Sequence, residues 1–336
     1  MSAKRSVGLL RRDILRGAAS VMGAAATFGL GLGRARAETY PSQPIKIVVP
    51  FAPGGPTDLM ARIVSAHLLQ SLGAAVAVEN KGGAGGNIGI GAVARAAPDG
   101  YTLLLTSSAF VVNPGLYAEV PYDPYKDFDP IAELGTTPNV ILVNPKTGIN
   151  SVAELCARAK ADPSAINYST AGIGTTPHLA AELLKVISGI HMTHVPYSGG
   201  APAVQAVLGG HVPVAVAALA PAHPHIKSGS VKALAVTGTN RWFDLPEVPT
   251  MIELGYKDFV SDTFQGFLAP AKTPPAIIEL LSTKAIEILK TPETAERLRN
   301  SGFEVIANGP EGMRKRIADE VPKWRDIVAK AGIQPI

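Results

Sequence analysis

A loop of glycine and proline near the start of the chain has the composition of an anion-binding loop. It follows an apolar run at 45–49 and contains Gly54 and Gly55, and apolar residues then recur every four positions from Met60 to Leu72. That spacing predicts a helix directly behind the loop. Because glycine leaves the backbone uncovered, unpaired N–H groups at the helix start can face a carboxylate or a phosphate. The alternative is a tight turn that needs glycine for steric reasons alone.

Two side chains near such loops, Asp58 and His178, each have two interpretations. Thr57 or Asp58 can cap the first turn of the predicted helix. As a cap Asp58 would steady the loop, which we favour, whereas as a ligand contact it would bind an amine. His178 comes just after a Thr-Thr-Pro sequence, and it can donate either to a ligand or to its own loop.

The remaining histidines do not indicate a metal site. His191 and His194 are three residues apart, which places them on opposite faces of an extended strand. His223 and His225 could share a metal, but no cysteine or nearby carboxylate joins them. We therefore expect no metal site.

Sequence signatures of catalysis and of cofactor binding are missing. The chain contains no G-x-S-x-G, H-E-x-x-H or C-x-x-C motif. The glycine-rich segment after Lys81 lacks both the G-x-G-x-x-G spacing and the lysine of a phosphate-binding loop. The single cysteine, Cys156, lies among apolar residues and is expected in the core. We expect no catalytic residue and no cofactor, with a hydrolase or isomerase as the less favoured alternative.

The first 37 residues have the pattern of a bacterial export signal. Arg11 and Arg12 open a twin-arginine-type motif, an uncharged run follows at 17–33, and 35–37 is an A-x-A cleavage site. Without this leader the chain has 24 basic and 26 acidic residues, a net charge of −2. That balance argues against nucleic acid as a partner. We expect a periplasmic protein whose mature form is not embedded in the membrane.

The rest of the chain alternates strand and helix, which predicts an α/β fold with parallel or mixed sheets flanked by helices. Small-residue loops recur between strand and helix at 51–58, 80–87, 171–178 and 197–202. We expect a first lobe from 38–137 plus 258–336 and a second lobe from 138–257, with the loops facing one another across a cleft. The expected strands are 45–50, 75–79, 101–106, 139–143, 166–170, 191–197, 212–219, 231–236 and one after 258; the later helices are about 275–289, 292–300 and 310–330.

Several segments, in order along the chain, resemble the Bug family of tripartite tricarboxylate transporter substrate-binding proteins. They read VPFAPGGPTD (49–58), NKGGAGGNIG (80–89), APDGYTLL (97–104), AGIGTTPHLA (171–180), HVPYSGGAPA (194–203), KALAV (232–236) and LPEVPT (245–250). The resemblance implies a two-lobed periplasmic-binding-protein fold of the Venus flytrap type, similar to type II, with a hinge between the lobes. It also implies that backbone amides and ordered water hold a small carboxylate.

The resemblance also assigns ligand-binding positions, residue by residue, to the loops of both lobes. In the first lobe they are Phe51, Ala52, Gly54, Gly55, Asp58, Ser107 and Ser108. In the second lobe they are Thr170, Thr175, Thr176, His178, Ser198, Gly199, Gly200 and Ala201.

Two departures from the family pattern bear on the ligand. Residues 215–219 carry no polar side chain where relatives commonly have an aromatic or polar pair, and Phe264 stands where a tryptophan is usual. Both suggest a less polar distal pocket, and hence an aromatic or aliphatic carboxylate.

The resemblance therefore implies a monomeric receptor that captures a small organic carboxylate and delivers it to the membrane subunits of a tripartite tricarboxylate-type transporter. A ligand-binding partner of a periplasmic sensor is the alternative. The sequence does not separate the two, because both would dock through the same outer surfaces.

Overall fold

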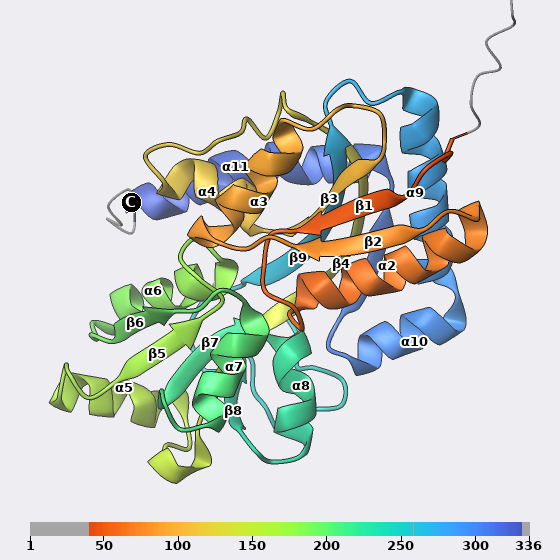
Figure 1. Cartoon of the computed structure of the whole chain (residues 1–336). Coiled ribbons are helices and arrows are strands. Elements are labelled where there is room, and N and C mark those ends of the chain that lie inside the picture. The colour runs from red at the N-terminus through yellow and green to blue at the C-terminus, as the bar shows by residue number, and fades with distance from the viewer. Residues whose placement is uncertain (1–39, 258, 331–336) are drawn as a thin grey trace, which may run out of the picture. The chain divides into compact units, whose positions relative to one another are not determined.

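The structure is a computed structural model that describes residues 40–257 and 259–330, so the predicted leader at 1–37 lies outside the described residues. The first lobe is built on a mixed sheet in the strand order β2-β1-β3-β9-β4, with β10 paired to β4 (Figure 1). β1 is parallel to β2 and β3, whereas β9 is antiparallel to β3 and β4. The strands are β1 (Ile45–Val49), β2 (Val76–Asn80), β3 (Thr102–Ser107), β4 (Phe128–Val143), β9 (Asp262–Pro270) and β10 (Glu304–Asn308).

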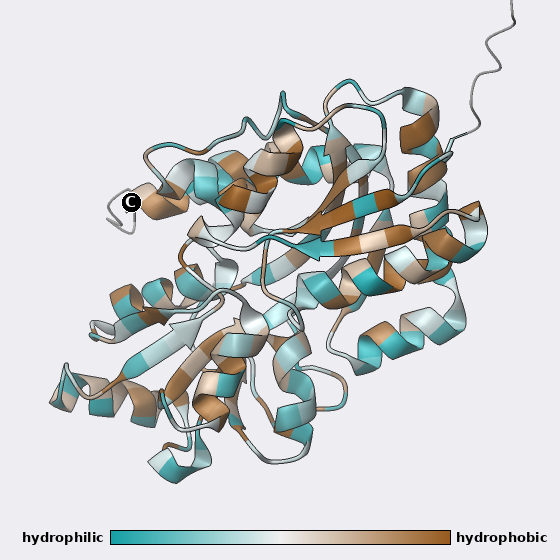
Figure 2. Cartoon of the chain, viewed as in Figure 1, coloured by the Kyte–Doolittle hydropathy of each residue, from teal (hydrophilic) through white to brown (hydrophobic). Residues whose placement is uncertain are grey.

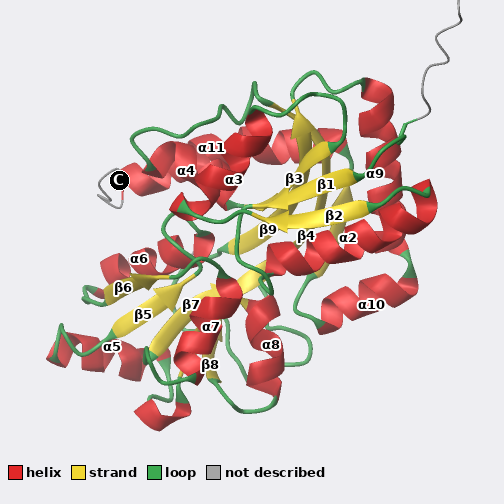
Figure 3. Ribbon diagram, viewed as in Figure 1, coloured by secondary structure: helices red, strands yellow, loops and turns green. Residues whose placement is uncertain are grey.

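Helices cover both faces of this sheet (Figure 3). One face packs on apolar residues of α2, α9 and α10, and the other on α3, α4 and α11. Each of these helices therefore buries an apolar side against the strands. Their bounds are α2 (Pro56–Leu72), α3 (Asn87–Ala94), α4 (Ala109–Leu116), α9 (Pro275–Lys290), α10 (Pro292–Asn300) and α11 (Pro310–Lys330).

The second lobe repeats the plan around the strand order β4-β7-β5-β6, with β8 paired to β4. β5 is parallel to β6 and β7, while β7 and β8 are antiparallel to β4. Apolar residues of α5 and α6 pack on one face and those of α7 and α8 on the other. The elements are α5 (Val152–Ala161), β5 (Asn167–Thr170), α6 (Thr176–Ser188), β6 (Thr193–Pro196), α7 (Gly200–Leu208), β7 (Val214–Ala218), α8 (Leu219–Lys227) and β8 (Lys232–Val236).

Strand β4 belongs to both lobes. Its residues 128–138 pair with β9, and its residues 139–143 pair with β7 and β8. The prediction that this strand begins at 139 was therefore wrong. Pro130 and Gly135 are residues that rarely occur inside strands, so the first part of β4 does not look like a strand in the sequence. The pairing with β9 shifts register beside both of them.

The predicted fold class is confirmed: the lobes are α/β layers with mixed sheets, and hydrophobic colour is concentrated on the central strands (Figure 2). The final segment returns to the first lobe, because β9 pairs with β3 and α11 packs on α4. The lobe boundaries at 137/138 and 257/258 stay a prediction. Within the described residues, no helix is long and apolar enough to cross a bilayer.

Candidate functional site

The loop between β1 and α2 is fixed by the buried carboxylate of Asp58. Its Oδ2 accepts hydrogen bonds from the Gly54 N–H (2.9 Å) and from Arg62 Nε (2.9 Å), and its Oδ1 accepts one from Asn80 Nδ2 (2.9 Å). Burial alone would raise the pKa of Asp58, but these hydrogen bonds outweigh it and lower the pKa. All of the donors belong to the protein, which favours the interpretation of Asp58 as a support of the loop.

The cap of α2 differs from the prediction. Gly55 occupies the N-cap position and Pro56 begins the helix, so neither Thr57 nor Asp58 is the cap. Proline suits the first helical position because its missing N–H would be unpaired there in any case. Gly54 has φ of 81°, a left-handed conformation that favours glycine. The side chain of Asp58 stabilises the turn from inside the helix by reaching back to Gly54.

Two loops of the second lobe face this turn. One runs from Ala171 to Thr175, where Thr175 Oγ1 donates to the Gly172 carbonyl (2.7 Å) and Thr175 is the N-cap of α6. The other contains Ser198 and Gly199 and leads into α7 at Gly200.

The lobes meet through these loops. The Ala52 N–H donates to the carbonyl of Ser198 across the cleft, at 3.0 Å. A Cβ on Gly199 would lie 3.1 Å from the nitrogen of Ala52, and one on Gly54 would lie 3.3 Å from the Cβ of Ala201. Glycine at these positions therefore lets two backbones approach closely. The amide of Ala52 is engaged with the protein in this arrangement.

A narrow cavity of about 30 Å³ lies where the loops converge, with room for about two or three water molecules. No acidic, basic or histidine side chain lines this cavity. Five predicted ligand-binding residues line it: Phe51, Gly55, Ser107, Thr175 and Gly200. The other lining residues are Pro56, Thr57, Ala171, Pro177, Ala218 and Thr263.

The remaining predicted residues lie behind or beside this cavity. Ala52, Gly54, Ser198, Gly199 and Ala201 form the contact between the loops. Asp58 supports the first loop. Ser108 Oγ accepts the N–H of Phe264 (2.9 Å), and Thr176 Oγ1 lies 2.6 Å from Thr263 Oγ1. Thr170 and His178 belong to the cluster described next.

A buried polar cluster under the second-lobe loops contains His178 and His194. Their rings stack with centroids 4.4 Å apart, and His194 Nε2 lies 2.7 Å from Thr170 Oγ1. Burial lowers the pKa of His178 to about 4 and that of His194 to about 3, despite the carboxylate of Glu182 3.9 Å from His178 Nε2. Both histidines are therefore neutral at neutral pH. No group of three His, Cys, Asp or Glu side chains in the described part of the chain is arranged to hold a metal ion.

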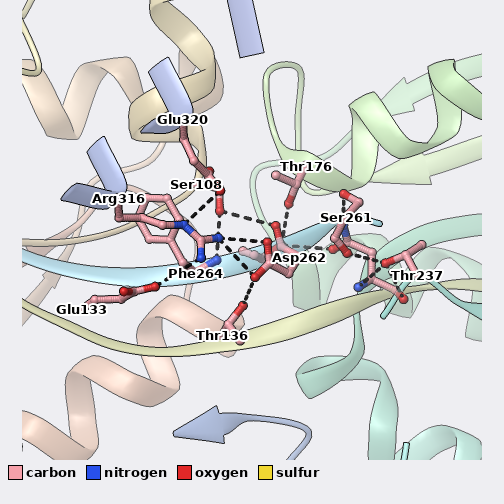
Figure 4. Close-up of polar contacts among 12 residues, drawn as sticks. Ser108, Glu133, Thr136, Thr176, Thr237, Ser261, Asp262, Phe264, Arg316 and Glu320 are labelled. Atoms are coloured by element: carbon pink, nitrogen blue, oxygen red, sulfur yellow. Dashed lines mark hydrogen bonds and ion pairs between the residues drawn. The ribbon is translucent and has the colours of Figure 1, made fainter. Parts of the chain in front are cut away.

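Beside the cavity lies a second polar group, the Arg316 cluster, in which Glu133 and Glu320 are buried and Asp262 and Arg316 are half-buried (Figure 4). Arg316 NH2 donates to Asp262 Oδ1 (3.0 Å), and its NH1 lies 3.4 Å from Glu133 Oε1. Its Nε lies 2.9 Å from Glu320 Oε1, at ion-pair distance but without hydrogen-bond alignment. One guanidinium thus serves three carboxylates.

Comparisons with known proteins decide the family. The profile described as "Tripartite tricarboxylate transporter family receptor" matches residues 60–333. The chain belongs to this family. It is 39% identical over 298 residues to Protein BugT of Bordetella pertussis, covering 88% of this chain and 91% of BugT.

Solved structures agree with this assignment. Periplasmic binding protein BugD is 38% identical, covers 88% of this chain and 100% of its own, and has a TM-score of 0.85. R. palustris Rpa4515, solved with adipate, is 32% identical, with the same coverage and a TM-score of 0.85. The predicted family and fold are confirmed. The family is one of periplasmic solute-binding receptors rather than enzymes.

Within this receptor fold, sequence reasoning missed Asn113 of α4 and Tyr117, the residue directly after α4, which both lie against the second-lobe loop 171–175. Asn113 Nδ2 donates to the Gly85 carbonyl (3.1 Å), and a Cβ on Gly174 would lie 2.1 Å from Asn113 Oδ1. The Tyr117 hydroxyl donates to the Ile173 carbonyl at 3.4 Å. Pro114 inside α4 obscured the helix. Tyr117 has an extended backbone just past the helix end, so no helical spacing links it to Asn113.

The structure does not support the expectation that Phe264 makes the distal pocket less polar. Phe264 is fully buried in the first-lobe core, where the Arg316 guanidinium lies 5.1 Å from its ring centre, and it does not line the cavity. Ala218, from the segment without polar side chains, does line the cavity. Of the two departures from the family pattern, only the segment 215–219 reaches the cavity, through Ala218.

Proposed function

We propose that this protein is a periplasmic receptor that captures a small organic carboxylate between its lobes and delivers it to the membrane subunits of a tripartite tricarboxylate-type transporter. One observation carries the proposal: the starts of three helices, α2 at Gly55, α6 at Thr175 and α7 at Gly200, converge on one cavity without charged side chains. Helix starts present unpaired N–H groups and a partial positive charge to an anion.

The chemistry of the lining matches a carboxylate held by neutral donors. The Ser107 hydroxyl accepts the Ala109 N–H and can donate its own proton to the ligand, whereas the hydroxyls of Thr175 and Thr263 already donate to Gly172 and Asn139. Because the cavity is narrow and shielded, water does not compete strongly, and each hydrogen bond to the carboxylate counts for more than in solution. The relative solved with adipate supports a carboxylate as the ligand class.

Capture couples to lobe movement through the loop contact. The hydrogen bond from Ala52 to Ser198 joins the loops of the two lobes, and strand β4 runs from one sheet into the other. A ligand that contacts both lobes stabilises their closed arrangement, since it binds that arrangement better than an open one. The membrane partner would recognise the surface that closure forms. We infer that the receptor acts as a monomer.

The test replaces Gly55 with valine, whose added methyl groups would occupy the cavity. A Cβ on Gly55 would meet Gly200 N at 3.6 Å, an ordinary contact, so folding should be retained. The wild-type melting temperature is expected to rise with acetate, hexanoate or adipate. In Gly55→Val that rise should vanish, with Kd raised about a hundredfold or more for the tightest of these ligands.

The matched control is Gly309→Val. Gly309 also directly precedes a proline that begins a helix, Pro310 of α11, and its Cβ would meet only Ser282 and Ile286 at 3.7 Å or more. It should bind like the wild type. Unchanged binding by Gly55→Val, or no response of the wild type to any carboxylate, would refute the proposal.

A further inference from the structure

The cavity of about 30 Å³ at the helix starts is called the inner cavity below. It adjoins a second, larger cavity of about 240 Å³, which we call the outer chamber. The two cavities share Phe51 and Ala171 in their walls. The outer chamber is otherwise enclosed by the glycine-rich segment 83–86, by Tyr117 and Ile173, and by residues 196–198. It therefore lies between the lobes and continues the site outward.

The glycines of 83–86 make this chamber possible. A Cβ on Gly86, which has φ of 98°, would lie 3.3 Å from the ring of Phe51, and one on Gly85 would lie 2.3 Å from the Ile173 carbonyl oxygen. Side chains there would force the lobes apart or fill the space. The glycine-rich segment after Lys81 thus forms a wall of the cleft.

The outer chamber contains no charged side chain and no histidine among its lining residues. Its polar side-chain groups are the hydroxyls of Tyr117, Tyr197 and Ser198. The Tyr117 hydroxyl already donates to Ile173, and burial raises the pKa of Tyr117, so that this phenol stays neutral. Two tyrosine rings, Phe51 and Ile173 supply most of its side-chain surface.

We propose that the outer chamber holds the uncharged body of a monocarboxylate whose carboxylate group occupies the inner cavity. The inference rests on the proposed function and names the ligand class for the same cleft. The inner cavity has room for little more than one carboxylate group. A second carboxylate in the chamber would lose water without gaining a countercharge, which is costly. An aromatic or aliphatic body gains by contact with the tyrosine rings.

The decisive experiment compares ligands that differ in one group. Hexanoate and adipate have the same six-carbon skeleton, but adipate ends in a second carboxylate. Titration calorimetry on the full mature chain should show hexanoate binding about tenfold tighter than adipate, or more, with phenylacetate also tighter than adipate. Acetate, which fills only the inner cavity, should bind more weakly than hexanoate.

Variants locate the effect in the outer chamber. Tyr117→Ala and Tyr197→Ala should weaken hexanoate and phenylacetate by about tenfold while changing acetate little, because acetate does not reach the rings. The matched control is Tyr125→Ala. Tyr125 is 55% exposed and lines neither cavity, so this variant should bind all probes like the wild type.

The outcomes separate this inference from the proposed function. If adipate binds as tightly as hexanoate or tighter, or if the tyrosine variants weaken acetate and hexanoate equally, the chamber inference is wrong while the receptor function stands. If no carboxylate binds at all, both are wrong. The comparison of hexanoate with adipate needs only the wild type, so it holds even if a tyrosine variant does not fold.

Discussion

At the start of β9 two neighbouring residues belong to different regions: Thr263 lines the cavity between the loops, and Asp262 binds Arg316 in the Arg316 cluster. Alternate residues of a strand point to opposite faces, so a single residue step separates the two. The cavity has no charged lining side chain, whereas the Arg316 cluster gathers three carboxylates around one guanidinium. In the cluster Glu133 and Glu320 are buried, while Arg316 and Asp262 remain partly exposed.

The two regions differ in the source of the charge that balances them. In the Arg316 cluster the fold itself must supply it, since buried charges without partners are strongly destabilising. Burial and the neighbouring carboxylates raise the pKa of Glu133 and of Glu320, although Arg316 opposes the shift. Under the proposed function the ligand brings the charge to the cavity, and neutral donors receive it without leaving an unpaired ion when the site is empty.

The largest expected effect follows from removing the guanidinium. Arg316→Met leaves three carboxylates facing one another, and we expect it to lower the free energy of unfolding at pH 7.5 by about 3–5 kcal/mol. Urea denaturation measures this loss. Arg314→Met is the control: it lies on the same helix, is mostly exposed and pairs only with Glu311, so its cost should stay below about 1 kcal/mol.

The pH dependence sharpens this test. Glu133 and Glu320 have folded-state pKa values raised above those of the unfolded chain, so their unfavourable contribution grows as pH rises through the folded pKa. Without Arg316 the pKa values of Glu133 and Glu320 should rise further, because the guanidinium that opposes the upward shift is gone. The stability difference between Arg316→Met and the wild type should therefore shrink at pH 5.5. An equal difference at both pH values would show that packing, and not charge, is what Arg316 provides.

A smaller effect is expected from the neutral histidines beside the cavity. Because His178 and His194 have lowered pKa values in the folded state, the unfolded chain binds more protons below about pH 6.5, and stability falls as pH decreases towards 4. Between pH 7 and pH 4.5 His178 should contribute a loss of roughly 2–3 kcal/mol. Glu182 and Lys185, which face these rings, stay paired with each other at 2.8 Å.

The measurement compares urea unfolding at the two pH values in the wild type and in His178→Gln/His194→Gln. The double variant should lose less stability on acidification than the wild type. His191 is exposed and lies just before β6, the strand that carries His194. The variant His191→Gln should therefore keep the pH dependence of the wild-type stability. If the double variant keeps it too, these histidines are not neutral because of burial.

The smallest effect concerns Asp58. Asp58→Asn retains the shape of the side chain but loses the negative charge that accepts hydrogen bonds from Gly54, Arg62 and Asn80. We expect the free energy of unfolding to fall by about 1–2 kcal/mol, a modest loss because Arg62 is partly exposed to water. Hexanoate should bind several-fold more weakly, since the first loop loses its support. Glu79→Gln, in an exposed pair with Lys46, is the control. Unchanged stability with altered preference for amine-containing ligands would instead make Asp58 a ligand contact.

The sequence by itself determined the local features of this protein. Periodic apolar residues specify helices such as α2 and α11, and the small-residue loops mark the strand ends that meet in the cleft, because these signals depend only on neighbours along the chain. The matched motifs were enough to identify the receptor family.

Tertiary structure alone decided which residues meet. The first part of β4 is a strand because β9 and β10 pair with it, and Asn113 and Tyr117 reach the second-lobe loop because α4 packs beside the glycine-rich segment. Phe264 lies in the core under Arg316, more than fifty residues away in sequence, and not in the pocket. Such contacts join distant segments, and no local pattern of residue types encodes which face of a strand or helix will receive them.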